Sequence, residues 1–251
     1  MKGRPRKVPR SHHAAVLLET GKVLVVGGAT SEVDAQSGVA RATSSAELFD
    51  PGTGAWAEVA PMKAPRFLPQ ATLLADGKVL VTGGGDERWN TIAQTELYDP
   101  AANSWRTVAT PASAGRIYHG AARLASGNVF IACGRTWTPN DVWRSDAEFY
   151  DPTKDQWFPA GGTGSSRTAP VVVGLGEHLL VAGGQSRQGN DFPLLDDARV
   201  YDETTGQWAA GPALAYGRLA AASVLLPSGD ILVCGGFSEE GGENTCELSS
   251  H

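Results

Sequence analysis

The sequence predicts an all-β protein built from about five copies of one four-stranded antiparallel unit. Two observations support this prediction: a pattern that recurs about every fifty residues, and short apolar runs separated by two-residue turns. A fixed period of this size is typical of repeat architectures whose units cannot bury their apolar faces alone. The copies are predicted at residues 10–60, 66–110, 116–160, 167–212 and 218–251.

Each copy begins with an arginine that precedes an apolar run. Residues 23–26 and 231–233 are short and rich in β-branched side chains, which predicts strands buried on both faces. A two-residue turn joins the first strand to the second, and its glycine supplies the positive φ that a tight hairpin needs. The arginines are Arg10, Arg66, Arg116, Arg167 and Arg218, and the turns are Thr20-Gly21, Asp76-Gly77, Ser126-Gly127 and Ser228-Gly229.

The second half of each copy predicts two further strands. A glycine pair ends the second strand, except in the third copy, where Cys133-Gly134 takes its place; an acidic-aromatic segment forms the third strand, and in the first four copies a tryptophan marks the fourth. The residue two positions before the tryptophan tolerates the left-handed region, as the connecting turn requires. We expect the tryptophans to be largely buried. The pairs are Gly27-Gly28, Gly83-Gly84, Cys133-Gly134, Gly183-Gly184 and Gly235-Gly236; the segments are 47–51, 96–100, 148–152 and 199–202; the turn residues are Gly54, Asn103, Asp155 and Gly206; the tryptophans are Trp56, Trp105, Trp157 and Trp208.

Together, these arginines, glycine pairs, acidic-aromatic segments and closing tryptophans resemble the kelch repeat over nearly the whole chain. The resemblance implies a single domain over residues 1–251, a β-propeller of about five four-stranded antiparallel blades around a central channel. Such a radial arrangement leaves only short, protected sheet edges. The resemblance is specific for the fold and says little about activity.

The two ends of the chain predict how the propeller closes. Residues 246–251 align with residues 46–51, so the fifth copy stops before its fourth strand. Residues 1–9 align with the fourth strand of a repeat, and we expect them to complete the last blade. Against this, Gly3 and Pro5 are poor strand residues. The alternative is that the chain is part of a ring of six or seven blades.

Composition narrows the classes of protein. The 251 residues, 41% of them hydrophobic, suffice for a large core, and the net charge of −6 argues against a general nucleic-acid binder. No apolar run approaches the roughly eighteen residues of a membrane span. No apolar stretch follows the basic N-terminal segment, so we expect no secretory signal and a cytoplasmic location, with a secreted protein as the alternative because kelch relatives also occur outside cells. We expect a monomer.

The cysteine pattern agrees with that location. Cys133, Cys234 and Cys246 fall at strand positions that other copies give to small residues. An odd number of cysteines at such positions predicts small buried thiols in a reducing compartment.

Aromatic residues outside the repeat pattern indicate a binding surface. In a four-stranded meander, the loop from the second to the third strand and the link into the next repeat emerge at the same end, which we call the loop face. Aromatic residues and arginine dominate binding hot spots. The alternative is that these side chains pack over neighbouring blades as lids. The loop residues concerned are Trp89, Trp137, Trp143, Phe192 and Phe237.

The kelch resemblance implies that the first strand is innermost, so the repeated arginines should surround the channel mouth, where a guanidinium fork suits a carboxylate or phosphate. The favoured alternative is internal pairing with the glutamates that begin the third strands, because a residue repeated in every blade more often stabilises the blade. The fourth copy has Arg199 where the others have glutamate, so we expect uncompensated positive charge at Arg167 and Arg199. These two, with Arg116 and Tyr118, complete the predicted binding residues. The glutamates are Glu47, Glu96, Glu148 and Glu247.

Two histidines raise the question of a metal. His13 and His119 occupy matching first-strand positions, and residues 116–119 resemble the copper-ligand segment of kelch-type galactose and glyoxal oxidases. The remaining ligands of such a site, including a cysteine cross-linked to a tyrosine, have no counterpart that the sequence places nearby. Imidazole alone does not select a metal. We therefore expect no metal, no cofactor and no catalytic residues.

The function that follows is a non-catalytic binding module. We expect it to recognise a protein or peptide partner, an acidic one included, on the loop face, with carbohydrate as a further option. No G-x-S-x-G or H-E-x-x-H motif is present. The alternative is an enzyme with a site at the channel mouth, either a copper-radical oxidase or a carbohydrate-processing enzyme.

Overall fold

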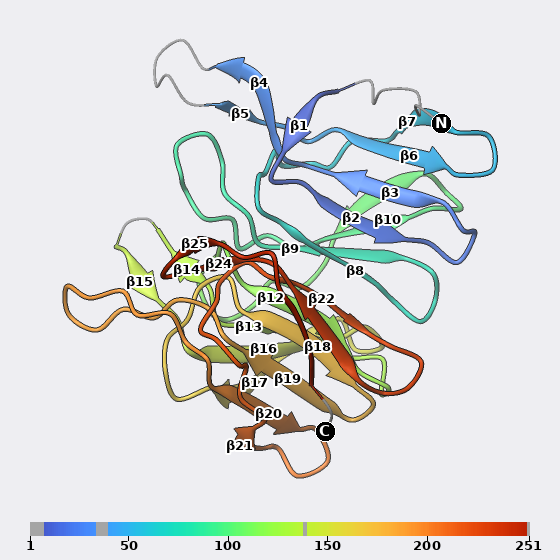
Figure 1. The fold of residues 1–251 in the computed structure, drawn as a ribbon. Helices are drawn as coiled ribbons and strands as arrows, with labels where there is room; N and C mark the ends of the chain where they lie inside the picture. Colours follow the sequence, from blue (N-terminus) through green and yellow to red (C-terminus); the bar gives the residue numbers. More distant parts are fainter. Residues whose placement is uncertain (1–7, 34–39, 138–139, 250–251) are drawn as a thin grey trace. The chain divides into compact units, whose positions relative to one another are not determined.

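The computed structural model describes residues 8–33, 40–137 and 140–249, and within these ranges the chain forms strands and turns but no helix (Figure 1). No segment of these ranges is therefore a helix long and apolar enough to cross a membrane. The chain divides into two compact units. Unit 1 comprises Met1–Ile117 and Trp137–Asn140, and unit 2 comprises Tyr118–Thr136 and Asp141–His251.

Unit 1 contains two four-stranded antiparallel sheets in which neighbouring strands follow chain order. The first consists of β2 (Ala14–Leu17), β3 (Val23–Val26), β6 (Ala46–Asp50) and β7 (Ala55–Val59). The second consists of β8 (Gln70–Leu73), β9 (Val79–Thr82), β10 (Glu96–Asp99) and β11 (Ser104–Thr107). A small third sheet joins β1 (Arg10–Ser11), β4 (Ala29–Val33) and β5 (Ala40–Ala42).

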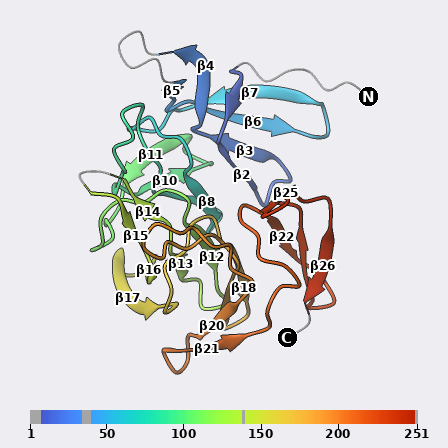
Figure 2. The same ribbon diagram turned by 60° about the vertical axis from the view of Figure 1, so that its left-hand side comes forward.

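Unit 2 repeats this arrangement (Figure 2). Its four-stranded sheets are β12 (Gly120–Arg123), β13 (Val129–Ala132), β16 (Asp146–Asp151) and β17 (Gln156–Gly162), then β18 (Val171–Leu175), β19 (His178–Ala182), β20 (Ala198–Asp202) and β21 (Gln207–Gly211). A three-stranded sheet joins β22 (Ala222–Leu225), β23 (Ile231–Cys234) and β26 (Cys246–Ser249). Two short hairpins, β14 (Arg135–Thr136) with β15 (Val142–Trp143) and β24 (Phe237–Ser238) with β25 (Gly241–Gly242), lie in second-to-third-strand connections.

The predicted four-stranded meander is confirmed for the first four copies. The fifth copy has three strands among the described residues. The expected closure by residues 1–9 rests on residues 1–7, which lie outside the described ranges. Arg10 and Ser11, which follow that segment, form β1 and pair with β4. Closure by the N-terminal segment therefore stays a prediction.

Local turn chemistry accounts for the regular hairpins. Gly21 has φ of 77° and its N–H donates to the Leu18 carbonyl at 2.9 Å, which closes the first turn. At the second turn, Asn103 adopts φ of 47° without being glycine, as asparagine tolerates. The predicted left-handed positions are thus confirmed, and they set the register of each meander.

The second strand of each repeat lies at the centre of the core. Every residue of β9 and of β13 is buried, which explains why these strands carry unbroken apolar runs. In unit 1, side chains from neighbouring sheets, including Leu24, Val79 and Tyr98, form one apolar cluster. Burying each such aliphatic side chain contributes about 1.5–3 kcal/mol.

The repeat tryptophans are partly buried, and Trp105 and Trp208 pack against the apolar clusters of their units. They lie on fourth strands, at the outer side of each sheet. The Trp105 ring lies 4.8 Å from the Tyr98 ring, and its Nε1 donates to the Ala60 carbonyl at 2.6 Å. Trp208 makes the same bond to the Ala160 carbonyl at 2.6 Å. Each therefore connects its sheet to the preceding one through an indole hydrogen bond.

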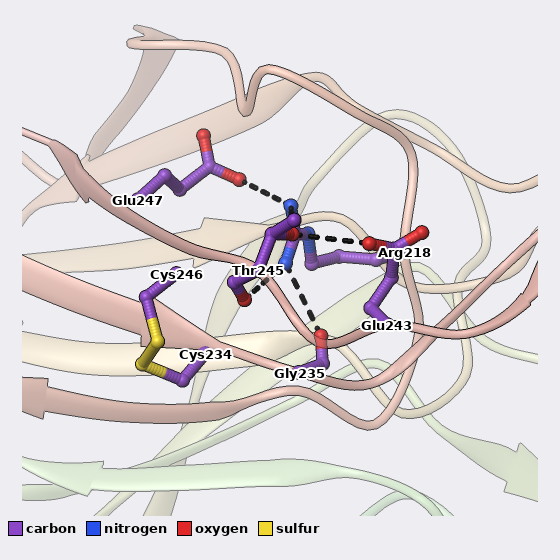
Figure 3. Close-up of a disulfide and its surroundings, with 7 residues drawn as sticks. All are labelled: Arg218, Cys234, Gly235, Glu243, Thr245, Cys246 and Glu247. Atoms are coloured by element: carbon purple, nitrogen blue, oxygen red, sulfur yellow. Dashed lines mark hydrogen bonds and ion pairs between the residues drawn. A yellow bond between two sulfur atoms is a disulfide. The ribbon is translucent and has the colours of Figure 1, made fainter.

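The cysteines also differ from expectation. Cys133 is buried and free, but Cys234 and Cys246 form a disulfide, so the prediction of three thiols is wrong for these two (Figure 3). Antiparallel pairing of β23 with β26 places the two residues directly opposite each other. The thiol argument for a reducing compartment does not apply to this pair, and the location of the protein stays a prediction.

The aspartate of each acidic-aromatic segment organises the turn that follows it. Its Oδ1 accepts backbone N–H groups two and three residues further on, as in Asp99 with Ala101 at 2.9 Å and Ala102 at 3.1 Å. Such a bond replaces a backbone turn hydrogen bond. The same pattern occurs at Asp50, Asp151 and Asp202.

This turn predicts an acid-sensitive contribution to stability. Hydrogen bonds from Lys154 and Thr153 lower the pKa of Asp151 to about 2, against about 3.9 in an unfolded chain. The unfolded state therefore binds more protons between these values, so the contribution is complete above about pH 4 and is lost as the pH falls to about 2. We expect the stability difference between wild type and Asp151→Asn to shrink over that range in urea titrations. A difference independent of pH would contradict it.

Candidate functional site

The repeat arginines are buried and bonded within their own repeats. Nη1 of Arg66 donates to the carbonyls of Gly83 and Gln94, each at 2.9 Å, and its Nη2 lies 2.8 Å from Glu96 Oε1. The side chains of Arg66 and Glu96 are both 0% exposed. Arg10 makes the same contacts with the carbonyls of Gly27 and Ser45 and with Glu47. Arg218 makes them with the carbonyls of Gly235 and Thr245 and with Glu247 (Figure 3).

The glutamate also holds the segment that leads into the repeat. Glu96 accepts the backbone N–H groups of Lys63 at 2.7 Å and of Ala64 at 3.1 Å. Burial lowers the pKa of Arg66, and the charge and hydrogen bond of Glu96 oppose that shift. The internal-pairing alternative is confirmed for Arg10, Arg66 and Arg218. In these repeats, the arginine and glutamate stabilise the sheet.

The fourth repeat uses a different carboxylate. Arg167 is 0% exposed, and its Nη2 lies 3.1 Å from Asp197 and donates to Ser165 Oγ at 2.9 Å. The expectation that Arg167 lacks a compensating carboxylate is therefore wrong. Asp197, two residues before Arg199, pairs with Arg167. Arg199 is 40% exposed, and its Nε lies 3.7 Å from the same Asp197. Two guanidinium groups thus share one carboxylate.

Arg116 and Tyr118 belong to different units. Arg116 is buried, and its Nη2 donates to Ser113 Oγ at 2.5 Å. Tyr118 is half-buried with φ of 54°, and His119 is buried. Among the residues that the structure describes, no three His, Cys, Asp or Glu side chains gather as a set of metal ligands. Among the described residues, no further set of ligands therefore accompanies residues 116–119, the segment that resembles a copper-ligand segment.

Backbone hydrogen bonds connect successive repeats at the residue two positions after each arginine. Leu68 N–H donates to the His12 carbonyl at 2.8 Å, and Ala169 N–H donates to that of Tyr118 at 2.7 Å. These positions share a positive φ although none is glycine: His12, Leu68, Tyr118, Ala169 and Ala220. The sequence does not reveal this feature, because the five positions carry four different residue types and none of these types signals a positive φ.

The loop aromatics of unit 1 pack on one another. The Trp89 ring lies 4.8 Å from the Phe67 ring and 5.2 Å from the Trp137 ring. Phe67 is buried, whereas both tryptophans are half-buried. For Trp89 and Trp137, the contacts fit the alternative of lids over a core edge.

The loop aromatics of unit 2 lie among charged groups. The Trp143 ring, on β15, is 5.6 Å from the ring of Phe192, which is 50% exposed. The Arg135 guanidinium lies 5.0 Å from the Trp143 centroid and binds Asp141, which Arg187 also approaches at 3.2 Å. Burial raises the pKa of Asp141, but the hydrogen bond and charge of Arg135 and the charge of Arg187 outweigh it and lower the pKa.

A cavity of about 840 Å³ lies between loops of the fourth and fifth repeats. Carboxylates line it, and Tyr216 contributes an aromatic ring that is 61% exposed. Phe237, 57% exposed, lies next to the cavity residue Ser238 on β24. We call Trp143, Phe192, Tyr216, Phe237 and this cavity the loop face of unit 2. The lining carboxylates are Asp196, Glu239, Glu240 and Glu243.

Part of this surface was not predicted. Nothing in the sequence marks Tyr216 as a binding residue, because a single tyrosine in a loop carries no motif. Glu239, Glu240 and Glu243 form an acidic cluster that the sequence shows, yet nothing in their spacing indicates a shared cavity.

Comparison with known proteins finds the same repeat in other proteins. The family model described as the kelch motif matches residues 9–63 and 69–112. A solved structure entitled "Structure of YjhT" superimposes with a TM-score of 0.81 at 14% identity, covering 96% of this chain and 81% of that chain. The predicted kelch resemblance and the β-propeller fold class are both confirmed.

Two of the relatives carry kelch names, and a third is an oxidase. An F-box/kelch-repeat protein of Arabidopsis thaliana is 29% identical over 60% of this chain and 36% of the relative. Kelch-like protein 36 of Bos taurus is 25% identical over 96% of this chain and 38% of the relative. Galactose oxidase of Gibberella zeae is 28% identical over 57% of this chain and 20% of that enzyme. The chain thus spans little more than a third of the length of the first two relatives.

Proposed function

We propose that the chain is a non-catalytic binding module that recognises a protein or peptide segment on the loop face of unit 2. The observation that carries this proposal is the exposure of aromatic residues outside the repeat pattern beside a cavity. Exposed aromatics at a concave site are typical of binding surfaces. The buried arginines, by contrast, already have partners within their repeats.

The relatives support an interaction module. Kelch-like protein 36 aligns over 96% of this chain, whereas galactose oxidase aligns over 57% of it. Charge then suggests the kind of segment. Four carboxylates line the cavity, so a segment that enters it should carry basic or neutral side chains. An acidic group of the partner would be repelled there.

Replacing Phe192 or Phe237 with alanine should weaken the binding of a peptide while leaving the fold intact. The probe is a peptide selected from a random library displayed on phage and panned against the purified protein. Each exposed ring removed from a binding surface should cost about 1–3 kcal/mol, or about 5- to 150-fold in Kd by calorimetric titration. Thermal melts should stay close to wild type because both rings are at least half exposed.

The matched control is Leu225→Ala, a similarly exposed apolar residue at the end of β22 next to the first turn of the fifth repeat. It should leave the affinity unchanged. Equal affinities in wild type and both phenylalanine variants would refute the proposed face. Stoichiometric copper or iron in the purified protein would favour the enzyme alternative instead.

A further inference from the structure

The fourth repeat lacks a carboxylate that other repeats direct at their backbone. In the second repeat, Glu96 accepts the N–H groups located three and two residues before Arg66. In the fifth repeat, Glu247 accepts the N–H of Ala215, three residues before Arg218, at 2.7 Å. The carboxylate of this glutamate is therefore a recurrent acceptor for the incoming segment.

In the fourth repeat an arginine occupies the same strand position. Arg199 pairs with Val181 across β19 and β20, as Glu96 pairs with Val81 and Glu247 with Val233. The corresponding backbone donors are the N–H groups of Gly164 and Ser165. Within the described part of the chain, neither donates to a protein acceptor.

The guanidinium of Arg199 lies close to Gly164, the first of these two residues. A Cβ placed on Gly164 would be 4.0 Å from Arg199 Nη2, and Gly164 has φ of 85°. Arg199 Nε is shielded from solvent and makes no hydrogen bond among the described residues. Arg199 therefore lies close to Gly164, whose backbone N–H and that of Ser165 correspond to donors that the glutamate accepts in the other repeats.

The local charge favours an anion. Asp197 lies 3.1 Å from Arg167 Nη2 and 3.7 Å from Arg199 Nε, so one negative charge faces two positive charges. Arg167 is fully buried and directs Nη2 at Asp197, which leaves the exposed Arg199 with the uncompensated charge. Exposure of 40% makes this guanidinium accessible to a ligand.

We propose that Arg199 and the amides of Gly164 and Ser165 form a binding site for a carboxylate, which takes the place of the missing glutamate. A planar guanidinium binds a carboxylate through two parallel hydrogen bonds, and backbone N–H groups add further donors. The site is distinct from the acidic cavity. It does not depend on the peptide face proposed above, and either can fail without the other.

Propionate, which reproduces the end of a glutamate side chain, should bind to this site. Amide resonances of Gly164 and Ser165 and the Nε resonance of Arg199 should shift and saturate on titration with propionate, but not with chloride at equal ionic strength. Arg199→Ala should weaken this binding about tenfold or more, and Arg199→Lys should restore it incompletely because lysine lacks the fork.

Arg199→Glu provides the decisive variant. Its own carboxylate should occupy the site, so propionate shifts disappear and the variant melts above Arg199→Ala. The double variant Asp197→Thr, Arg199→Glu reproduces the Thr245 and Glu247 pair of the fifth repeat and should behave in the same way, which separates the result from repulsion by Asp197. Equal propionate responses in wild type and Arg199→Glu, or equal responses to propionate and chloride in wild type, would refute the proposal.

Two sources of the carboxylate are distinguished by a second titration. A blocked peptide with one internal glutamate is compared with its glutamine counterpart and with propionate. Binding of the glutamate peptide about tenfold tighter than both supports an acidic side chain of a partner. Binding no tighter than propionate supports a small free carboxylic acid. Loss of discrimination between glutamate and glutamine peptides in wild type would contradict a carboxylate site for peptides.

Discussion

Replacing Arg66 with alanine should lower the free energy of unfolding by about 3–5 kcal/mol, because removing one partner leaves the other charge buried and unpaired. Glu96 is 0% exposed and would lose its cationic partner. The carbonyls of Gly83 and Gln94 would also lose their donor. Urea-induced unfolding followed by tryptophan fluorescence measures the loss.

The matched control is Arg199→Ala in the fourth repeat, where the guanidinium is exposed and shares its carboxylate. That variant should change stability by less than about 1 kcal/mol. The double variant Arg66→Ala, Glu96→Leu should recover part of the loss, since it removes the stranded charge. A loss below about 1 kcal/mol for Arg66→Ala alone would show that the pair does not stabilise the repeat.

Replacing Trp105 with alanine should cost about 2–4 kcal/mol. A fully buried tryptophan costs about 3–5 kcal/mol, and this ring is only half-buried, but its hydrogen bond to the Ala60 carbonyl is lost as well. That bond joins successive sheets of unit 1. Trp105→Phe should cost less, because phenylalanine keeps the stacking on Tyr98 and loses only the indole N–H.

The control for this change is Leu17→Ala on β2 of the same unit. Leu17 is 62% exposed, so its loss should stay within about 0.5 kcal/mol. Thermal and urea unfolding of the three variants rank them directly. Equal stability of Trp105→Ala and Leu17→Ala would mean that the repeat tryptophan does not connect the sheets.

Residues shared by the repeats stabilise the sheets, whereas departures from the repeat mark the candidate sites. An arginine occupies the position of Arg66 in every copy, and Arg66 itself is buried against Glu96 of the same repeat. Arg199 breaks the pattern and is exposed. Trp143 and Phe192 have no counterparts in the repeat, and the fold brings them together on the loop face of unit 2. In this chain, the candidate binding residues therefore lie where the sequences of the copies differ.

Sequence reasoning located the loop aromatics but not their surroundings. Trp143 and Phe192 were identifiable because large aromatics stand out from the repeat pattern. Their charged neighbours Arg135 and Arg187 come from different loops and meet only at Asp141. Pairing between loops depends on how the sheets pack, and no local pattern encodes it.

The sequence by itself determined the four-stranded repeat, because hairpin turns and buried strands depend on residues close together in the chain. Gly21 and Asn103 were predictable from the left-handed conformation that their turns require. Tertiary structure alone decided which carboxylate reaches Arg167 and which cysteines pair. Asp197 is two residues away from the position that the repeat predicts, and Cys246 meets Cys234 only through the register of two strands. Both outcomes depend on distances between side chains across a sheet, which the order of residues does not specify.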